Sequence, residues 1–242
     1  MKIPNWQPAR TKDGQAIPSK TIDIWLIDLN PADYEFPRPD ESDFAADELE
    51  RASRFRFDRH RRQYLVGRDA LRGILAGYTG DEAKKVQFQY GEFGKPALDP
   101  SYSLSFNLSN SHEMALIAIT KLSGVGADIE FRDRHMWEID SLAKTVFTDE
   151  ECAELNVYPS NDRLIPFLSG WTRKEAYLKA IGKGLALPLK GFSVQLDNSL
   201  NKPQISVPEW DLLSFWATED YICSVAYPAG EQPALRWFKF TD

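Results

Sequence analysis

The stretch Trp171-Thr172-Arg173-Lys174-Glu175-Ala176-Tyr177-Leu178-Lys179 carries more chemistry than any other part of the sequence. It falls in the middle of a predicted helix that runs from about Arg163 to Ile181. At 3.6 residues per turn, Trp171, Glu175 and Lys179 lie one above the other on one helix face. This face is either a solvent-exposed Glu–Lys pair, which stabilises a helix only weakly, or the charged wall of a ligand site.

Two acidic residues lie upstream, in the predicted strand Val125-Gly126-Ala127-Asp128-Ile129-Glu130. Side chains alternate along a strand, so Asp128 and Glu130 share a face and lie about 7 Å apart. Two carboxylates at that distance repel each other unless a cation lies between them. The pair is therefore either a solvated strand face or a site for a hard cation such as Mg²⁺, which prefers oxygen ligands.

A second predicted helix, from Arg54 to Tyr78, concentrates positive charge in a chain whose net charge is −7. Guanidinium groups bind phosphate oxygens two at a time, so this helix is either a solvated surface or a cradle for a polyanion. The two interpretations are about equally supported by the sequence. The region contains the eight arginines Arg51, Arg54, Arg56, Arg59, Arg61, Arg62, Arg68 and Arg72.

A tight turn and a hairpin are predicted between the basic helix and the acidic strand. The turn is Gly91-Glu92-Phe93-Gly94-Lys95-Pro96, in which glycine permits close backbone approach and proline stiffens the loop. The hairpin spans residues 102–120, with Ser109-Asn110-Ser111-His112 as its polar turn. Ser109 and Asn110 either satisfy the backbone of that turn, the commoner use of such residues, or contact a ligand.

The composition of the chain bounds its class. A length of 242 residues, 43% of them hydrophobic and seven of them Trp, allows one large or two small domains with a packed core. The acidic balance argues against general nucleic-acid binding. Cys152 and Cys223 lack metal-ligand spacing, so we expect two reduced thiols. Without a secretory or membrane-spanning pattern, the protein is expected to be cytoplasmic and not membrane-bound.

At this point the sequence resembles the 4′-phosphopantetheinyl transferases of the surfactin-synthetase (Sfp) type, over roughly Arg51 to Val194. The combination of Asp-x-Glu with Trp-x-x-Lys-Glu-x-x-x-Lys is specific, whereas either piece alone is not. The resemblance rests on Phe93-Gly94-Lys95-Pro96, Phe106-Asn107-Leu108-Ser109, Gly126-Ala127-Asp128-Ile129-Glu130, Trp171 to Lys179, and Gly182-Lys183-Gly184-Leu185.

The resemblance implies an α+β fold of two similar α/β halves related by a pseudo-twofold axis, with the active site in the cleft between them. The corresponding ranges are a flexible arm at 1–20, an N-terminal half at 21–123 and a C-terminal half at 124–242. From the residues alone, strands separated by turn residues are predicted in the second half at about 191–196, 204–207, 212–218, 221–227 and 235–240. Such enzymes move the 4′-phosphopantetheine group of coenzyme A to a serine of an apo acyl, peptidyl or aryl carrier protein and release 3′,5′-ADP. They use Mg²⁺, for which Mn²⁺ is a possible substitute, and a chain with both halves is expected to be a monomer.

The resemblance also implies roles for individual residues. Asp128, Glu130 and Glu175 would hold Mg²⁺, and Glu175 or Glu130 would take the serine proton. Lys179 would stabilise or protonate the departing phosphate, and Lys174 would neutralise further phosphate charge. Adenine would lie at the Gly94-Lys95-Pro96 turn and the 3′-phosphate at Ser109. The implied coenzyme A contacts are Arg51, Arg62, Gly94, Lys95, Pro96, Ser109, Asn110, Lys174 and Lys179.

The sequence departs from the family pattern at Asn110, where the family commonly has histidine after the serine. Asn110 can donate a neutral hydrogen bond but carries no charge. We therefore expect weaker discrimination between coenzyme A and its dephospho form. His112, two residues on, is interpreted as an ordinary turn histidine rather than a ligand.

Two other functions remain open. One is a coenzyme A or carrier-protein binding protein of the same fold without turnover, although the intact Asp128, Glu130, Glu175 and Lys179 argue against it. The other is an unrelated Mg²⁺-dependent nucleotide hydrolase, for which a Walker loop is lacking. Apolar residues of the segment that follows the acidic strand either contact the carrier or belong to the core: Trp137, Leu142, Val146, Phe147 and Leu155.

Overall fold

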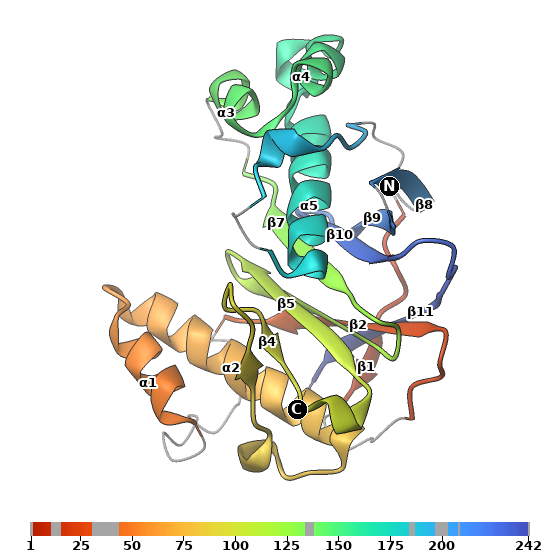
Figure 1. Ribbon diagram of the computed structural model, residues 1–242. Coiled ribbons are helices and arrows are strands. Elements are labelled where there is room, and N and C mark those ends of the chain that lie inside the picture. The colour runs from red at the N-terminus through yellow and green to blue at the C-terminus, as the bar shows by residue number, and fades with distance from the viewer. Residues whose placement is uncertain are drawn as a thin grey trace.

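The computed structural model describes residues 2–10, 16–30, 44–133, 138–183, 187–196, 203–207 and 209–241 (Figure 1). The helices are α1 (Ala46–Ser53), α2 (Asp58–Thr79), α3 (Ile139–Val146), α4 (Asp149–Asn156) and α5 (Leu164–Ile181). The strands are β1 (Gln7–Ala9), β2 (Thr21–Asp28), β3 (Gln89–Tyr90), β4 (Pro96–Ala97), β5 (Ser105–Ser111), β6 (Met114–Thr120), β7 (Gly126–Phe131), β8 (Pro203–Val207), β9 (Trp210–Thr218), β10 (Tyr221–Pro228) and β11 (Ala234–Phe240).

Two β-sheets form the framework of the protein. The first has the strand order β1-β11-β2-β6-β5, in which β11 runs parallel to both of its neighbours. The second has the order β7-β10-β9-β8 and is antiparallel throughout. Strands β3 and β4 form a separate small hairpin. The mixed α+β class predicted from the sequence is confirmed.

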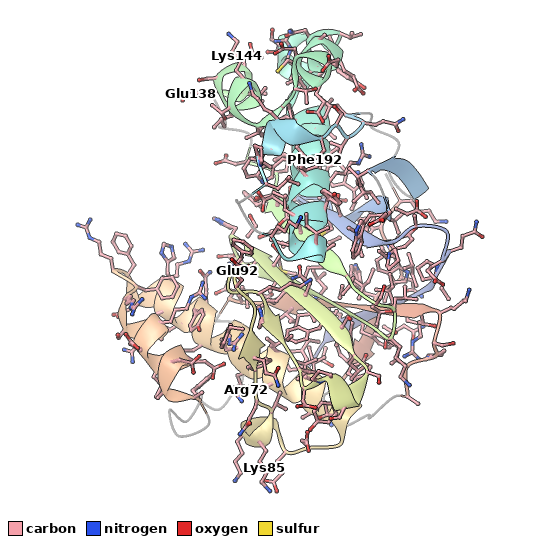
Figure 2. All side chains as sticks on the ribbon, viewed as in Figure 1. Arg72, Lys85, Glu92, Glu138, Lys144 and Phe192 are labelled. Carbon is pink, nitrogen blue, oxygen red and sulfur yellow. The ribbon has the colours of Figure 1, made fainter. Side chains whose placement is uncertain are left out.

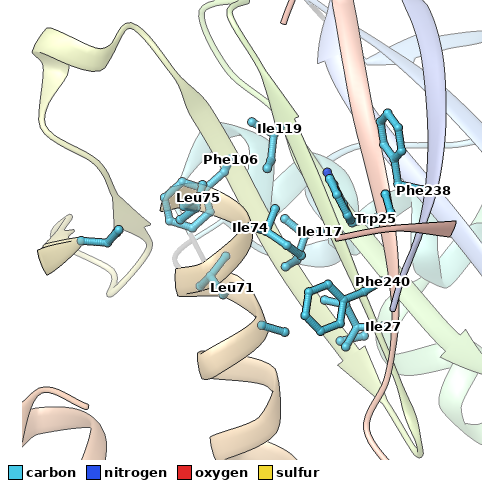
Figure 3. Close-up of a cluster of buried hydrophobic side chains, with 14 of the residues drawn as sticks. Trp25, Ile27, Leu71, Ile74, Leu75, Phe106, Ile117, Ile119, Phe238 and Phe240 are labelled. Atoms are coloured by element: carbon cyan, nitrogen blue, oxygen red, sulfur yellow. The ribbon is translucent and has the colours of Figure 1, made fainter. Parts of the chain in front are cut away.

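Helix α2 covers one face of the first sheet. Its residues Leu71, Ile74 and Leu75 recur at helical spacing and are almost completely buried. Figure 3 shows these side chains among those of the core cluster. They pack with side chains that alternate along the strands of that sheet, namely Trp25, Ile27, Phe106, Ile117, Ile119, Phe238 and Phe240. The helix ends at Gly80, whose φ of 81° gives the left-handed cap that favours glycine.

The two sheets pack against each other through their other faces. Alternate residues of β2, such as Ile22 and Ile24, share a buried cluster with Ala127 and Ile129 of β7. Helix α5 then covers the outer face of the second sheet, where Ala176 and other α5 residues pack in a further cluster with residues of β9 and β10. The layers therefore run α2, first sheet, second sheet, α5, which explains why β2 reads as an almost continuous apolar run.

Gly126 allows α5 to lie unusually close to β7. A Cβ atom at this position would collide with the Ala176 carbonyl oxygen and the Ala180 backbone nitrogen. This contact sets the distance between the helix with the Trp-Glu-Lys face and the strand with the acidic pair.

A buried polar cluster fastens the last strand to the first sheet. Asp23 is fully buried and accepts two hydrogen bonds of 2.6 Å from the Arg236 guanidinium of β11. Tyr78 of α2 donates to the same carboxylate at 2.6 Å and accepts from the Trp25 indole at 2.9 Å. Burial raises the pKa of the Tyr78 hydroxyl, so it remains a donor.

Three predicted features differ from the structure. The last strand was expected in the C-terminal half, but β11 pairs with β2 in the first sheet, because Arg236 meets Asp23 there. The arm at 1–20 was expected to be flexible, yet residues 7–9 pair with β11 as β1 and Ile17 is buried. The polar hairpin turn was expected to include Ser109, whereas β5 continues through Ser111.

The remaining segments include one further correction. Residues 191–196 were expected to form a strand. Instead, a 3₁₀ turn at Leu189–Gly191 leads into an irregular segment that buries Val194 and Leu196. Helix α5 matches its predicted range and ends at Gly182 in the left-handed region. Trp137, Gly184 and Leu185 lie outside the described residues.

Candidate active site

Helix α5 presents its Trp-Glu-Lys face to the seam between the two sheets. The Trp171 indole donates a hydrogen bond of 3.0 Å to Glu130 Oε1 of β7. Two turns further along α5, the Lys179 ammonium donates to Asp128 Oδ1 at 2.6 Å. Glu175 lies between them and lines a pocket together with Lys179. The charged face therefore contacts β7 and lines a pocket, and it is not a solvated Glu–Lys pair.

Strand β5 meets β7 at this seam through side chains. Three alternate residues of β5, Asn107, Ser109 and Ser111, form hydrogen bonds to β7, and we call them the polar ladder. Asn107 Oδ1 accepts from the Ala127 backbone N–H at 2.8 Å. Ser109 donates to Asp128 Oδ1 at 2.8 Å, and Ser111 donates to Glu130 Oε2 at 2.8 Å. The polar ladder thereby joins the edge strands of the two sheets.

Negative charge exceeds positive charge in this cluster. Burial raises the pKa of Asp128, although Lys179 and Ser109 oppose the shift. Burial and the nearby Asp128 raise the pKa values of Glu130 and Glu175. Asp128 Oδ2 is buried and has no hydrogen-bond partner among the residues described. Three carboxylates that affect one another, one ammonium group and an unpartnered carboxylate oxygen have the chemistry that suits a cation.

The described side chains do not by themselves complete a metal centre. In the parts of the chain that the structure describes, no three His, Cys, Asp or Glu side chains converge closely enough to hold an ion. The predicted trio of Asp128, Glu130 and Glu175 is thus near one pocket but not drawn together around one point.

A pocket of about 260 Å³ opens beside this cluster. Its walls come from the β3–β4 loop, from β5 and from the last turns of α5. They consist of Phe93, Gly94, Lys95, Pro96, Asn107, Leu108, Glu175, Leu178, Lys179 and Gly182. The predicted Gly-Lys-Pro turn and the charged helix face therefore line the same cavity.

Lys95 fastens the β3–β4 loop to the second sheet and α5. Its ammonium donates hydrogen bonds of 3.1 Å to the Val125 carbonyl and 3.0 Å to the Ala180 carbonyl. Burial lowers the pKa of Lys95 to about 8. Gly94, with a φ of 77°, supplies the left-handed turn that directs this lysine inward.

Residues 40–122 match the model of the 4′-phosphopantetheinyl transferase N-terminal domain, and residues 124–226 match that of the 4′-phosphopantetheinyl transferase superfamily. The chain is 36% identical over 223 residues to the 4′-phosphopantetheinyl transferase HetI of Nostoc sp., which covers 89% of this chain and 91% of HetI. The chain belongs to the 4′-phosphopantetheinyl transferase superfamily.

Further relatives within the superfamily are more distant or match over shorter stretches. The chain is 38% identical over 145 residues to the phosphopantetheinyl transferase AcpT of Salmonella typhimurium, with 60% of this chain and 70% of AcpT covered. It is 29% identical over 147 residues to Sfp of Bacillus subtilis, with 61% of this chain and 64% of Sfp covered. These matches confirm the family resemblance predicted from the motifs.

The structure of this phosphopantetheinyl transferase does not bring Lys174 to the pocket. Its side chain is fully buried, pairs with Glu151 at 2.8 Å and donates to the Leu189 and Phe192 carbonyls, both at 2.7 Å. In Figure 2, Phe192 lies beside α5 well away from Glu92 of the pocket-side β3–β4 loop. On the helix, Lys174 precedes Glu175 by one position and therefore points to a different face.

The arginine-rich region of the transferase is only partly available for a ligand. Arg68 and Arg72 are buried and pair with buried Glu48, at 2.5 Å and 2.8 Å. Arg51 and Arg62 are exposed on α1 and α2, and neither lines the pocket. Arg68 and Arg72 therefore do not form a cradle for a polyanion, because their guanidinium groups neutralise the buried Glu48 carboxylate.

The remaining predicted residues lie on the surface or in the core. Asn110 is exposed, on the opposite face of β5 from the polar ladder. His112 adopts a φ of 53° in the two-residue hairpin loop and stacks on the Phe131 ring with centroids 4.6 Å apart. Among the apolar residues after β7, Val146, Phe147 and Leu155 belong to the core, whereas Leu142 is 40% exposed.

The contacts of Asn107 and Ser111 with the acidic strand β7 were not predicted from the sequence. The signal was the alternation of polar side chains at positions 107, 109 and 111, which indicates one strand face. It was obscured because residues 109–112 resemble a turn. The helices that the structure describes include none that is long and apolar enough to cross a bilayer.

Proposed function

We propose that this protein transfers the 4′-phosphopantetheine group of coenzyme A to a serine of an apo carrier protein in an Mg²⁺-dependent reaction. The other product is 3′,5′-ADP. Membership of the superfamily supports the reaction class. The observation that supports the assignment in this chain is the hydrogen bond of Lys179 to Asp128 beside a pocket that is lined by Glu175 and by the Gly94-Lys95-Pro96 turn.

The donor set fits Mg²⁺. Asp128 Oδ2 is buried without a partner, and the surrounding carboxylates carry more charge than Lys179 balances. Asp128, Glu130 and Glu175 would hold the ion, with water and phosphate oxygens as further ligands, because Mg²⁺ binds few carboxylates and keeps several waters. Bound there, Mg²⁺ would neutralise pyrophosphate charge and polarise the phosphorus. Mn²⁺ has the same ligand preference and is the natural substitute.

Glu175 is the better candidate for the general base. Its carboxylate lines the pocket, and the described part of the chain gives it no hydrogen-bond or ion-pair partner. Both oxygens of Glu130, by contrast, already accept hydrogen bonds from Trp171 and Ser111. The raised pKa of Glu175 suits a group that must accept a proton near neutral pH.

In the transfer step, one bond to phosphorus forms and one breaks. The carrier serine oxygen forms a bond to the phosphorus that bears pantetheine, and its proton moves to Glu175. The bond from that phosphorus to the bridging oxygen breaks, and 3′,5′-ADP leaves with the electron pair. Lys179 has three N–H donors, of which Asp128 and Ser109 take two, so the third can stabilise the departing oxygen.

The residues that line the pocket, and those near it, indicate the proposed substrate contacts. Gly94, Lys95 and Pro96 are proposed to lie at the adenine, since they line the cavity. A contact of Ser109 with the 3′-phosphate would compete with its bond to Asp128. Arg51 and Arg62, which are exposed on α1 and α2, are proposed as basic contacts to coenzyme A outside the pocket. Leu142 is the exposed candidate for carrier contact.

The arrangement of the chain supports the two-half proposal. Residues 21–123 and 124–242 each contain a sheet covered by one long helix, α2 or α5, except that β11 joins the first sheet. A pseudo-twofold axis would relate these halves, and the substrate cleft would follow the seam between β5 and β7. A single chain would then contain the whole site and work as a monomer. The two free cysteines suit a cytoplasmic location.

Intact-protein mass spectrometry tests the proposal. The protein is incubated with an apo carrier protein, coenzyme A and Mg²⁺, and a carrier mass increase of about 340 Da, the mass of the transferred group, is expected. The increase should require Mg²⁺ and be absent with Glu175→Ala, but persist with Glu219→Ala, which removes an exposed carboxylate outside the pocket. Binding of coenzyme A without any mass increase would instead identify a binding protein without turnover.

A further inference from the structure

Glu130 is held by two neutral donors that come from different elements. Ser111 of β5 donates to Oε2 at 2.8 Å, and the Trp171 indole of α5 donates to Oε1 at 3.0 Å. Asp128, two residues earlier on β7, instead receives the Lys179 ammonium. The two carboxylates of the acidic pair are thus fixed in different ways.

The direction of both hydrogen bonds to Glu130 is determined. Ser111 Oγ accepts a hydrogen bond of 3.1 Å from the Phe131 backbone N–H, so its own proton is left for Glu130. An indole nitrogen is a donor only. Both partners therefore match an ionised carboxylate, and each leaves the second lone pair of its Glu130 oxygen available.

Both donors lie on rigid supports. Ser111 is the last residue of β5 and pairs with Met114 of β6. The Trp171 ring is half-buried on α5 and packs against Phe167, with an angle of 15° between the ring planes. Groups on paired strands and packed helices hold a ligand more accurately than groups on loops.

We propose that Ser111 and Trp171 are positioning residues that hold the Glu130 carboxylate as a fully charged ligand for the divalent cation. Because their donors are neutral, they orient Glu130 without cancelling the charge that attracts the ion. Partners of this kind around a metal ligand typically change metal affinity by about 10- to 100-fold. The inference rests on the proposed metal-dependent function and adds two residues from outside the pocket lining to it.

Direct Mn²⁺ binding tests the inference without relying on turnover. Titration calorimetry and Mn²⁺ paramagnetic resonance are run on the full-length protein with and without coenzyme A. Ser111→Ala and Trp171→Phe are each expected to weaken Mn²⁺ binding by about tenfold. Trp171→Phe keeps an aromatic ring against Phe167 and removes the N–H, and Ser111→Thr should restore binding because it keeps the hydroxyl.

Matched controls separate positioning from general damage. Ser105→Ala removes another β5 hydroxyl, which donates to the Leu122 carbonyl, and Trp6→Phe removes another indole donor, which donates to the Ala217 carbonyl. Neither control should change Mn²⁺ affinity. Carrier modification is measured in parallel for every variant.

The outcomes are distinguishable. Wild-type Mn²⁺ affinity in both Ser111→Ala and Trp171→Phe, or no detectable Mn²⁺ binding by the wild type, overturns the inference even if carrier modification is observed. Weakened binding in both variants without any carrier modification by the wild type supports the inference and overturns the proposed transfer reaction. Weakening by the two controls to the same extent also overturns the inference.

Discussion

Lys179 Nζ lies 2.6 Å from Asp128 Oδ1 and joins the end of α5 to the middle of β7. The Asp128 side chain is 4% exposed and that of Lys179 is 29% exposed, so the carboxylate depends on this ammonium group for its compensation. The pair is therefore a structural and an electrostatic connection at once.

Replacing Lys179 with Met should leave Asp128 as a buried carboxylate without a cation. We expect the free energy of unfolding in urea at pH 7, without metal, to fall by about 3 kcal/mol. The double variant Asp128→Asn with Lys179→Met should recover most of that loss. Strictly additive effects of the two substitutions would contradict a coupling between these residues.

Glu175→Gln should stabilise the metal-free protein and disable transfer. Burial and Asp128 raise the pKa of Glu175 above its usual 4.5, so the folded protein holds the proton more tightly than the unfolded chain. The stability that this group contributes is present at low pH and lost as pH rises through the folded pKa. The melting temperature of the variant should thus exceed that of wild type at pH 7 but not at pH 4.

The transfer rate of Glu175→Gln should fall by about 10²- to 10⁴-fold, the range for loss of a general base. An unchanged transfer rate of Glu175→Gln would show that Glu175 is not the general base and would leave Glu130 as the candidate. A melting temperature of the variant below that of wild type at pH 7 would contradict this prediction. It would show that the folded protein stabilises the charged form of Glu175.

Lys95→Met should change how stability depends on alkaline pH. The pKa of Lys95 falls to about 8 in the folded protein from an ordinary 10.5, so between these values the unfolded chain binds a proton that the folded protein lacks. Wild-type stability should rise with pH relative to the variant, by up to about 1.4 kcal/mol per pH unit. Parallel stability curves for the two proteins from pH 7 to 10 would rule out the shifted lysine.

Gly126→Ala should separate α5 from β7. The added methyl group would meet backbone atoms of Ala176 and Ala180, which cannot rotate away. We expect a loss of about 3 kcal/mol in thermal or urea unfolding and a marked loss of activity. Gly67→Ala in α2, where the new Cβ would have an ordinary 3.4 Å contact with Leu29, is the control and should be neutral or slightly stabilising.

Asn110→His should improve discrimination against the dephospho form of coenzyme A. The exposed Asn110 offers only a neutral hydrogen bond, whereas a protonated imidazole would add charge for the 3′-phosphate. The ratio of kcat/KM values for the two donors should rise by about threefold to tenfold. The same ratio in wild type and variant would show that residue 110 does not take part in recognising the 3′-phosphate.

Local patterns made much of the site predictable. The spacing of Trp171, Glu175 and Lys179 and the alternation of Asp128 and Glu130 each depend only on helix or strand geometry, and the structure confirms both faces. For Asn107 and Ser111, the alternation could indicate a shared strand face but not their role. Their partners lie on β7 of the other sheet, so their roles depend on a contact between distant segments.

Long-range pairing also explains the errors. Lys174 carries an ammonium group that could bind phosphate, but it is buried and pairs with Glu151 of α4. No sequence pattern near Lys174 indicates that partner. The predicted position of β11 was wrong for a similar reason. Its alternating apolar residues are compatible with either sheet, and the pairing of Arg236 with buried Asp23 belongs to the first one.

The place of β11 between β1 and β2 has a consequence for synthesis on the ribosome. Asp23 and Arg236 are 213 positions apart, so β2 leaves the ribosome with one edge open long before its parallel partner exists. Pairing over such a separation is slow, and the exposed edge of an apolar strand is a template for aggregation in the meantime. Nascent chains that stop before Ala234 should therefore depend on chaperones, whereas chains that include β11 can close the first sheet.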